Sequence, residues 1–398
     1  MLTYEQALET LLAAAQAVTR TELIDSHLAL GRILAEPVCS TINVPPVDNS
    51  AMDGYALRVA DAADLPVRLP VTLRVPAGAA PGILPAAAAA RIFTGAPVPA
   101  GADVVVPQEH CRAEDGAVVL ERPLRAGDNI RRAGEDIRIG AEVLAAGTLL
   151  GPAHMGLLAS IGVAQVRVYG RLRVAAFFTG DELVMPGEAL GPGKIYNSNR
   201  HVLHGLLGAL GCVVTDLGII PDNLEATRAA LRQAAEGHDL IMTSGGVSVG
   251  EEDHVKNALQ AEGTLQTWKI AIKPGKPLAF GEVAGTPFIG LPGNPVSGFV
   301  TFMILAQPYI RKRQGAGVVR PRALTLRADF SWTKTTPMRE FLRVRRNEQG
   351  GLELYPRQGS GVLSSCVWAD GLVENPPENT IQPGDPVRYI PFGELLWA

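Results

Sequence analysis

The stretch DLIMTSGGVSVGEED, residues 239–253, determines how the middle of the chain folds. It begins with a short apolar run, which predicts a buried strand, and continues with Gly245, Gly246 and Gly250. Glycines let a backbone adopt positive φ and approach a ligand closely. A helix expected over 253–261 would offer free N–H groups and a positive dipole to an anion. The pattern predicts an anion site at the edge of an α/β sheet, although an ordinary strand–helix turn explains the glycines equally well.

Strands and helices alternate on both sides of this stretch. Strands are expected at 172–178, 212–220, 240–244, 265–272, 278–283 and 286–291, and helices at 198–210, 223–236, 253–261 and 294–312. This alternation predicts an open, mostly parallel sheet with helices on both faces. Ligands of such sheets bind beyond the carboxyl ends of the strands, where Ser244 and Ser248 would add hydroxyl groups.

The regions before and after the α/β pattern have different residue patterns. Thr3 and Gln6 form a capping-box pattern before an amphipathic helix, and a second short helix, HLALGRILA, is expected after Ser26. Residues 41–150 are rich in proline and glycine with short β-type runs, which predicts an all-β module. One more helix is expected between Pro152 and Gly162. Residues 320–398 again contain short β-type runs, which predict a small C-terminal β domain.

Composition narrows the possible functions. The 398 residues are 47% hydrophobic and 19% charged, which predicts a folded, multidomain chain. A formal net charge of −4 argues against nonspecific nucleic-acid binding, so attraction for an anion must be local. No apolar run approaches the roughly 18 residues of a membrane span. The four cysteines show neither metal-ligand spacing nor a disulfide framework, and a reducing, cytoplasmic location is the simplest interpretation.

Three lysines surround the stiff turn KPGKP at 273–277. They are Lys269, Lys273 and Lys276, and the two prolines of the turn fix φ. Cations held near one site offset the desolvation of an anion better than mobile surface lysines do. The alternative is a solvated basic loop.

The motif LPGNP at 291–295 follows a strand and precedes the long helix, a second ligand-binding position of an open sheet. Asn294 would be the N-cap and Pro295 the first helical residue, with Pro292 before them. Capping is in itself an adequate structural explanation for this motif.

Carboxylates follow other strands at the same edge. Glu182 comes after the strand at 172–178, Asp222 after the strand at 212–220, and Asp253 belongs to an acidic run. Acidic groups beside an anion site indicate a bound divalent cation, or they are helix-start carboxylates favoured by the dipole. In the β module, Asp53, Thr94 and Asp136 lie in turn-forming segments, which explains them without a function.

Six separated segments together resemble one family. DNSAMDGYA, FTGAPVPAGAD, TGDEL, SGGVSVGEED, KPGKP and LPGNPVS occur in the order and spacing of the molybdopterin molybdenumtransferases, the MoeA and gephyrin E-domain family. The resemblance spans nearly the whole chain.

The resemblance implies a four-part, multidomain α/β plus β architecture. The parts would be a helical and β linker region at 16–40 and 141–168, a β subdomain at 41–140, a molybdopterin-binding α/β domain at 1–15 and 169–318, and a C-terminal β-barrel-like domain at 319–398. It also implies a homodimer, with each active site between the α/β domain of one subunit and the β regions of the other.

The reaction implied is insertion of molybdate into adenylylated molybdopterin with Mg²⁺-dependent release of AMP. The family's functional positions match Asp53, Thr94, Asp136, Glu182, Asp222 and Asp253. By resemblance, Glu182, Asp222 and Asp136 would hold Mg²⁺ or position water. The phosphate and molybdate pocket would comprise Ser244, Gly245, Gly246, Ser248, Gly250, Lys269, Lys273, Lys276, Pro292, Asn294 and Pro295. Arg343 and Ser360 look like C-terminal oxyanion contacts, with Arg339 as an alternative to Arg343.

Two other functions remain open. An adenylyltransferase of the same pathway would share the α/β domain but little else, and the resemblance implies that the chain contacts that enzyme and other cofactor-biosynthesis proteins. A gephyrin-like scaffold would need a second pterin domain and a long linker, neither of which is present. A tungstate preference is a further alternative.

Overall fold

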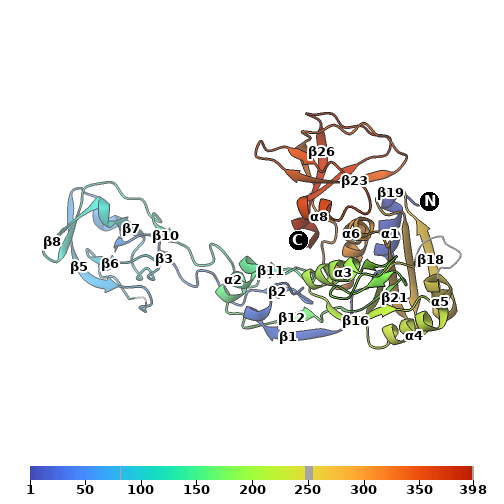
Figure 1. Cartoon of the computed structure of the whole chain (residues 1–398). Coiled ribbons are helices and arrows are strands. Elements are labelled where there is room, and N and C mark those ends of the chain that lie inside the picture. Colours follow the sequence, from blue (N-terminus) through green and yellow to red (C-terminus); the bar gives the residue numbers. More distant parts are fainter. Residues whose placement is uncertain (81, 247–253, 397–398) are drawn as a thin grey trace.

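The computed structural model describes residues 1–80, 82–246 and 254–396. Its elongated shape places the β subdomain at one end, joined to the remainder by a narrow connection (Figure 1). The α/β domain and the C-terminal domain lie together at the other end. None of the described helices is long and apolar enough to cross a membrane.

The α/β domain is built on a six-stranded sheet. Its order is β16 (Val213–Ile220), β13 (Arg173–Thr179), β17 (Leu240–Ser244), β21 (Thr286–Leu291), β20 (Pro277–Val283) and β18 (Gly263–Lys269). The first four strands pair in parallel, and β20 and β18 add antiparallel pairs at one edge. The multidomain α/β fold and the mostly parallel sheet are therefore confirmed.

Alternate residues of β13 face two separate cores, as the pleat of a strand requires. Val174, Ala176 and Phe178 pack in one core, whereas Ala175 and Phe177 pack in the other. Helices α1 (Tyr4–Ala14), α3 (Ser198–Ala209), α6 (Pro295–Thr301) and α7 (Gln307–Arg313) contribute to the first core, and α4 (Leu224–Ala235) and α5 (His254–Glu262) to the second. Both faces of the sheet are thus covered.

The N-terminal helix begins at the predicted capping box. Thr3 Oγ1 accepts the Gln6 N–H at 3.2 Å, and Gln6 Oε1 accepts the Thr3 N–H at 2.9 Å. The N–H of Leu2 donates to the Lys269 carbonyl at 2.9 Å. The first residues of the chain are thereby attached to the edge of the α/β sheet.

The long helix expected over 294–312 is interrupted. Helices α6 and α7 are joined by a π-helical turn, Phe302–Ala306. Pro308 explains the interruption, because it lacks the N–H that would bond to the Ile304 carbonyl four residues earlier. The hydroxyl of Tyr4 on α1 reaches that carbonyl instead, at 3.4 Å.

The β subdomain contains a six-stranded sheet between two small cores. Its order is β7 (Val104–Pro107), β4 (Gly54–Leu57), β6 (Ala89–Ile92), β5 (Val67–Val75), β9 (Ala117–Leu120) and β8 (Cys111–Glu114). A short ladder of β3 (Asn49–Ser50) with β10 (Ile130–Arg131) lies where the two chain segments enter the subdomain.

The connection between the subdomain and the sheet consists of short paired strands and one helix. β1 (Thr21–Asp25) pairs with β12 (Gln165–Tyr169), β2 (Val38–Cys39) pairs with β11 (Glu142–Leu144), and α2 spans Pro152–Ser160 as predicted. The helix predicted after Ser26 is wrong, since only a 3₁₀ turn, Ser26–Leu28, forms there. Gly31 has a φ of +72°, which turns the chain back so that Leu34 bridges to Val168.

The C-terminal sheet includes a strand from the α/β domain. Its order is β19 (Ile272–Lys273), β23 (Arg339–Arg346), β25 (Gly371–Asn375), β26 (Pro386–Pro391) and β22 (Leu324–Arg327), with β24 (Leu352–Leu354) also beside β23. Short helices α8 (Ser364–Trp368) and α9 (Phe392–Leu396) complete the domain. Because Lys273 begins the KPGKP turn and also lies in β19, this end of the turn is paired directly with the C-terminal domain.

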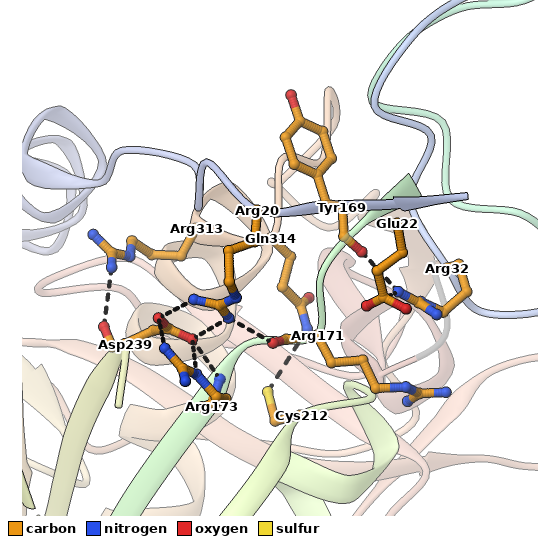
Figure 2. A network of polar contacts seen from close by, with 10 residues as sticks. All are labelled: Arg20, Glu22, Arg32, Tyr169, Arg171, Arg173, Cys212, Asp239, Arg313 and Gln314. Atoms are coloured by element: carbon orange, nitrogen blue, oxygen red, sulfur yellow. Dashed lines mark hydrogen bonds and ion pairs between the residues drawn. The ribbon is translucent and has the colours of Figure 1, made fainter. Parts of the chain in front are cut away.

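A polar network ties the connecting region to the α/β sheet (Figure 2). The carboxylate of Asp239, directly before β17, accepts two hydrogen bonds of 2.8 Å from the Arg20 guanidinium and one of 2.8 Å from the Arg173 N–H. The Asp239 carbonyl accepts from Arg313 of α7 at 3.0 Å. One aspartate thus joins the segment before β1, the sheet and the end of the long helix.

Candidate functional site

A cavity of about 850 Å³ lies where the carboxyl ends of β13, β17 and β21 meet. Its walls come from the segments after these strands, the start of α3, the KPGKP turn and two segments of the C-terminal domain. Of the predicted site residues, those that line it are Glu182, Asp222, Ser244, Gly245, Gly246, Lys273, Lys276, Pro292, Asn294, Pro295 and Ser360. Residues distant in sequence therefore converge as the strand-end argument predicted.

The glycine turn after β17 requires its glycines. Gly245 and Gly246 have φ values of +99° and +63°. A Cβ added to Gly246 would lie 2.4 Å from Val255 Cγ2 and 2.8 Å from Thr179 Oγ1. The backbone can therefore pass between β13 and α5 only without a side chain at this position. Ser248, Gly250 and Asp253, which were also predicted to act here, lie outside the described residues.

The basic wall of the cavity is built on the KPGKP turn. Lys273 Nζ is 3.0 Å from the buried carboxylate of Glu340, whose other oxygen accepts the Trp332 indole N–H at 2.6 Å. The Lys273 side chain is still 43% exposed, so its ammonium can face both Glu340 and the cavity. Lys276 also lines the cavity, whereas Lys269 lies on β18 and does not.

Acidic groups also line the cavity. Glu182 and Asp222 both line the cavity, and the Asp222 N–H donates to Asp181 Oδ1 at 3.3 Å. A Cβ added to Gly180 would be 2.6 Å from Glu182 Oε2, so this carboxylate lies over Gly180. The cavity wall therefore carries both cationic and anionic side chains.

The carboxylates of Glu182 and Asp222 are ligands of the kind that Mg²⁺ binds. Within the described part of the chain, no group of three or more His, Cys, Asp or Glu side chains could hold a metal ion. Mg²⁺, however, commonly uses one or two carboxylates together with substrate phosphates and water. Glu182 and Asp222 supply two carboxylates, which fits an ion that binds together with a phosphate-bearing substrate. Asp136 does not join them within one chain.

The C-terminal domain contributes a loop to the cavity. The Ser360 carbonyl accepts the Val296 N–H at 3.0 Å, which attaches this loop to the start of α6. Arg343 does not line the cavity; it is 1% exposed, and its guanidinium donates to Ser365 Oγ and the Phe341 and Gly359 carbonyls. Burial lowers the pKa of Arg343 to about 10. Arg343 therefore supports the Ser360 loop through its hydrogen bond to the Gly359 carbonyl, without lining the cavity itself.

The alternative arginine is elsewhere. Arg339 forms ion pairs with Glu5 and Glu374, and its guanidinium lies over the Tyr4 ring. It does not line the cavity.

The three predicted residues of the β module also lie outside the cavity. Asp53 Oδ1 accepts both the N–H and the hydroxyl of Thr94, at 2.7 and 2.8 Å. These two hydrogen bonds lower the pKa of Asp53. Asp136 is exposed on a neighbouring loop, where its N–H donates to the Val44 carbonyl. The β subdomain is distant from the α/β domain in the same chain (Figure 1).

Sequence analysis missed two asparagines at the start of α3. Asn197 caps this helix by accepting the Arg200 N–H at 3.1 Å, and Asn199 contacts both the Ser244 and Gly293 segments. Both line the cavity. The signal was present in the sequence YNSNR at 196–200, a helix start directly following a loop from the same sheet edge.

Three family models, all from molybdopterin-related families, match successive parts of the chain. Residues 2–162 match the MoeA N-terminal region (domain I and II), residues 175–312 the probable molybdopterin binding domain, and residues 325–392 the MoeA C-terminal region (domain IV).

Individual relatives agree over most or all of the chain. The molybdopterin molybdenumtransferase of Haemophilus influenzae is 41% identical over 100% of both chains. Molybdopterin molybdenumtransferase 2 of Mycobacterium tuberculosis is 38% identical over 88% of this chain and 89% of its own. The crystal structure of the molybdopterin biosynthesis MoeA protein from Pyrococcus horikoshii OT3 superposes with a TM-score of 0.87 at 28% identity, covering 98% of this chain and 100% of that one. The chain therefore belongs to the MoeA family of molybdopterin molybdenumtransferases.

Proposed function

We propose that this protein is a transferase of molybdenum cofactor biosynthesis that inserts molybdate into adenylylated molybdopterin and releases AMP. The observation that supports this most directly is the cavity of about 850 Å³ whose wall carries both lysines and carboxylates. Molybdate and the pterin phosphate are anions, which the lysines and the N–H groups of the glycine turn suit. A volume of this size suits a ligand with two ring systems and a phosphoanhydride.

The basic and the acidic residues of the cavity would bind different parts of the substrates. Lys273, Lys276 and the backbone around Ser360 would bind molybdate, because all three line the cavity and the two lysines supply positive charge there. Glu182 and Asp222 would hold Mg²⁺ against the phosphoanhydride. When bound, Mg²⁺ would neutralise charge that develops on the phosphates as AMP leaves.

We also propose that the working form is a homodimer. Asp53, Thr94 and Asp136 belong to a subdomain distant from the cavity of their own chain, and a second subunit could bring its own copies to it. Mixing two inactive variants tests this: Glu182→Gln and Asp136→Asn homodimers, unfolded and refolded together, should regain about a quarter to a half of the wild-type rate if sites are shared. No recovery would leave each site within one subunit.

Turnover itself tests the function. Purified protein is given adenylylated molybdopterin, molybdate and Mg²⁺, and AMP is measured. Glu182→Gln is expected to lower kcat by at least about a hundredfold, since a neutral amide would replace one of the two carboxylates that would hold Mg²⁺. Glu225→Gln, an exposed glutamate on α4, is the matched control. Wild-type rates in Glu182→Gln would show that this carboxylate has no part in the step.

The same assay separates the alternatives. An adenylyltransferase would consume ATP and molybdopterin, and a scaffold would bind a partner peptide without any turnover. Tungstate in place of molybdate reveals the oxyanion preference. We place the protein in the cytoplasm, together with the adenylyltransferase that would supply its substrate.

A further inference from the structure

The side chain of Asn199 joins three segments on one side of the cavity. It lies on the first turn of α3, and its Nδ2 atom is 2.8 Å from Ser244 Oγ and 2.7 Å from the Gly293 carbonyl oxygen. Ser244 ends β17, and Gly293 lies in the turn between β21 and α6. One amide group therefore connects the start of α3 to the ends of two adjacent parallel strands.

The chemistry of these neighbours fixes the orientation of the amide. A carbonyl oxygen can only accept, so the Asn199 atom that faces Gly293 must be the nitrogen and not the oxygen. Its two hydrogens are both used, one for Gly293 and one for Ser244. No hydrogen bond among the described residues ends on Asn199 Oδ1. If the amide rotated by half a turn, its oxygen would face the Gly293 carbonyl oxygen and that hydrogen bond would be lost.

The hydroxyl of Ser244 is also fully committed as a donor. Its oxygen accepts from Asn199, and its single hydrogen is donated to the Pro292 carbonyl at 3.1 Å. The Ser244 residue is 5% exposed. A bound anion requires donors, and a hydroxyl has only one hydrogen to donate. Ser244 therefore holds the two turns together through its hydroxyl, while its direct contact with a ligand stays a prediction.

The two turns that this clamp connects are in close contact. A Cβ added to Gly293 would lie 3.6 Å from the Gly245 Cα atom. The Gly245 N–H also donates to the Leu291 carbonyl at 3.2 Å. Movement of one turn would therefore shift the other, and both line the cavity.

We propose that Asn199 is a positioning residue, which clamps Ser244 to Gly293 and thereby fixes the backbone turns that receive the phosphate-bearing part of the substrate. This role rests on the proposed function for its effect on turnover, but the clamp itself does not depend on it. Misplacing reacting groups by about 1 Å can cost on the order of a hundredfold in rate.

Two variants of Asn199 test the proposal. Asn199→Ala removes the clamp, and Asn199→Asp keeps the size but places a carboxylate oxygen against the Gly293 carbonyl. Both are expected to lower kcat for AMP release by at least about tenfold while KM changes by less than about threefold, because the turns are misplaced rather than lost. Amide hydrogens of 244–246 and of the non-proline residues in 291–296 should exchange at least about tenfold faster.

A mutational cycle sharpens the test. Adding Ser244→Ala to Asn199→Ala should cost less than the sum of the two single losses, because each substitution removes the Asn199–Ser244 hydrogen bond, although Ser244→Ala also removes the bond to Pro292. Asn379→Ala in the C-terminal domain is the control, since it removes an amide that donates to Asn375 at 2.8 Å far from the cavity turns. It should leave kcat and exchange at these turns unchanged.

The outcomes are distinct. Unchanged exchange and kcat in Asn199→Ala would overturn the clamp, and a fall in kcat with unchanged exchange would mean that Asn199 contacts the substrate instead. Fully additive losses with Ser244→Ala would also overturn it. If the wild type releases no AMP, the proposed function fails, while faster exchange in the Asn199 variants would still establish the clamp and unchanged exchange would refute it.

Discussion

Gly246 combines two constraints that can be separated experimentally. Its φ of +63° disfavours any side chain, and an added Cβ would meet Val255 Cγ2 at 2.4 Å. Gly237→Ala is the control, because it has a φ of +74° with nothing within 4 Å. Both substitutions should cost about 1–2 kcal/mol for the left-handed backbone, and Gly246→Ala should cost roughly 1–3 kcal/mol more for overpacking. Equal urea midpoints for the two variants would contradict this.

Arg343 supports the Ser360 loop through a guanidinium that contacts three separate acceptors. Arg343→Lys keeps a charge but cannot reach all three, so it should lower the free energy of unfolding by roughly 2–4 kcal/mol. Molybdate affinity, measured by calorimetry, should also fall. Arg345→Lys is the control, since that guanidinium is 45% exposed on the same strand. An affinity loss without destabilisation would instead indicate direct contact between Arg343 and the anion.

Some site residues could be predicted because they follow a local pattern, and others could not. Glu182, Gly246 and Lys273 each lie directly beyond a strand or within a stiff turn, and all three line the cavity. The burial of Arg343 depends on how β23 packs against α8, which no sequence pattern specifies. YNSNR indicates a helix start near Asn199, but its contacts could not be predicted because its partners lie 45 and 94 residues away in the chain.

At the scale of elements, the sequence predicted strands and helices well where hydrophobic periodicity and caps agreed. Helix α1 begins at its capping box, and α2 lies between Pro152 and Gly162. The segment HLALGRILA failed because tertiary pairing overrode helix propensity. Ile33 bridges to Leu149, so burial in the connecting region determined its conformation.

The π-helical turn between α6 and α7 gives a prediction about two elements. If Tyr4 replaces the bond that Pro308 cannot make to Ile304, Tyr4→Phe should cost about 0.5–1.5 kcal/mol in the wild-type background. In a Pro308→Ala background, the restored N–H can bond to Ile304, and the cost of Tyr4→Phe should shrink. Urea unfolding of the four proteins gives the coupling energy. Independent, additive effects would mean that the hydroxyl contact has no role in stability.

At the scale of the whole molecule, periodicity and composition indicated α/β and β parts but not the distance between them; only the resemblance, which placed each site between two subunits, implied that they are separated. Asp136 was grouped with Glu182 and Asp222 because the family resemblance joined them, whereas the single chain keeps the β subdomain apart (Figure 1). Short ladders such as β2 with β11 set this distance, and their few residues carry little hydrophobic signal. A site shared between subunits cannot be read from contacts within one chain.

The junction at Asp239 connects the separated parts and should make their attachment sensitive to acid (Figure 2). Burial alone would raise the pKa of Asp239, but hydrogen bonds from Arg20 and Arg173 outweigh it and lower the pKa to about 2. A carboxyl whose pKa is lower in the folded state stabilises it above the ordinary pKa of about 3.9. That contribution is lost as the pH falls from about 4 toward 2.

Asp239→Asn should therefore lower the free energy of unfolding by roughly 1–3 kcal/mol at pH 7. Because the wild type loses the same contribution in acid, the difference between the two urea midpoints should narrow as the pH falls from 5 to 3. Asp115→Asn, in the exposed turn between β8 and β9, controls for loss of a charge. A constant difference from pH 7 to pH 3 would mean that the charge of Asp239 does not stabilise the junction, and that shape and neutral hydrogen bonds hold the connecting region to the sheet.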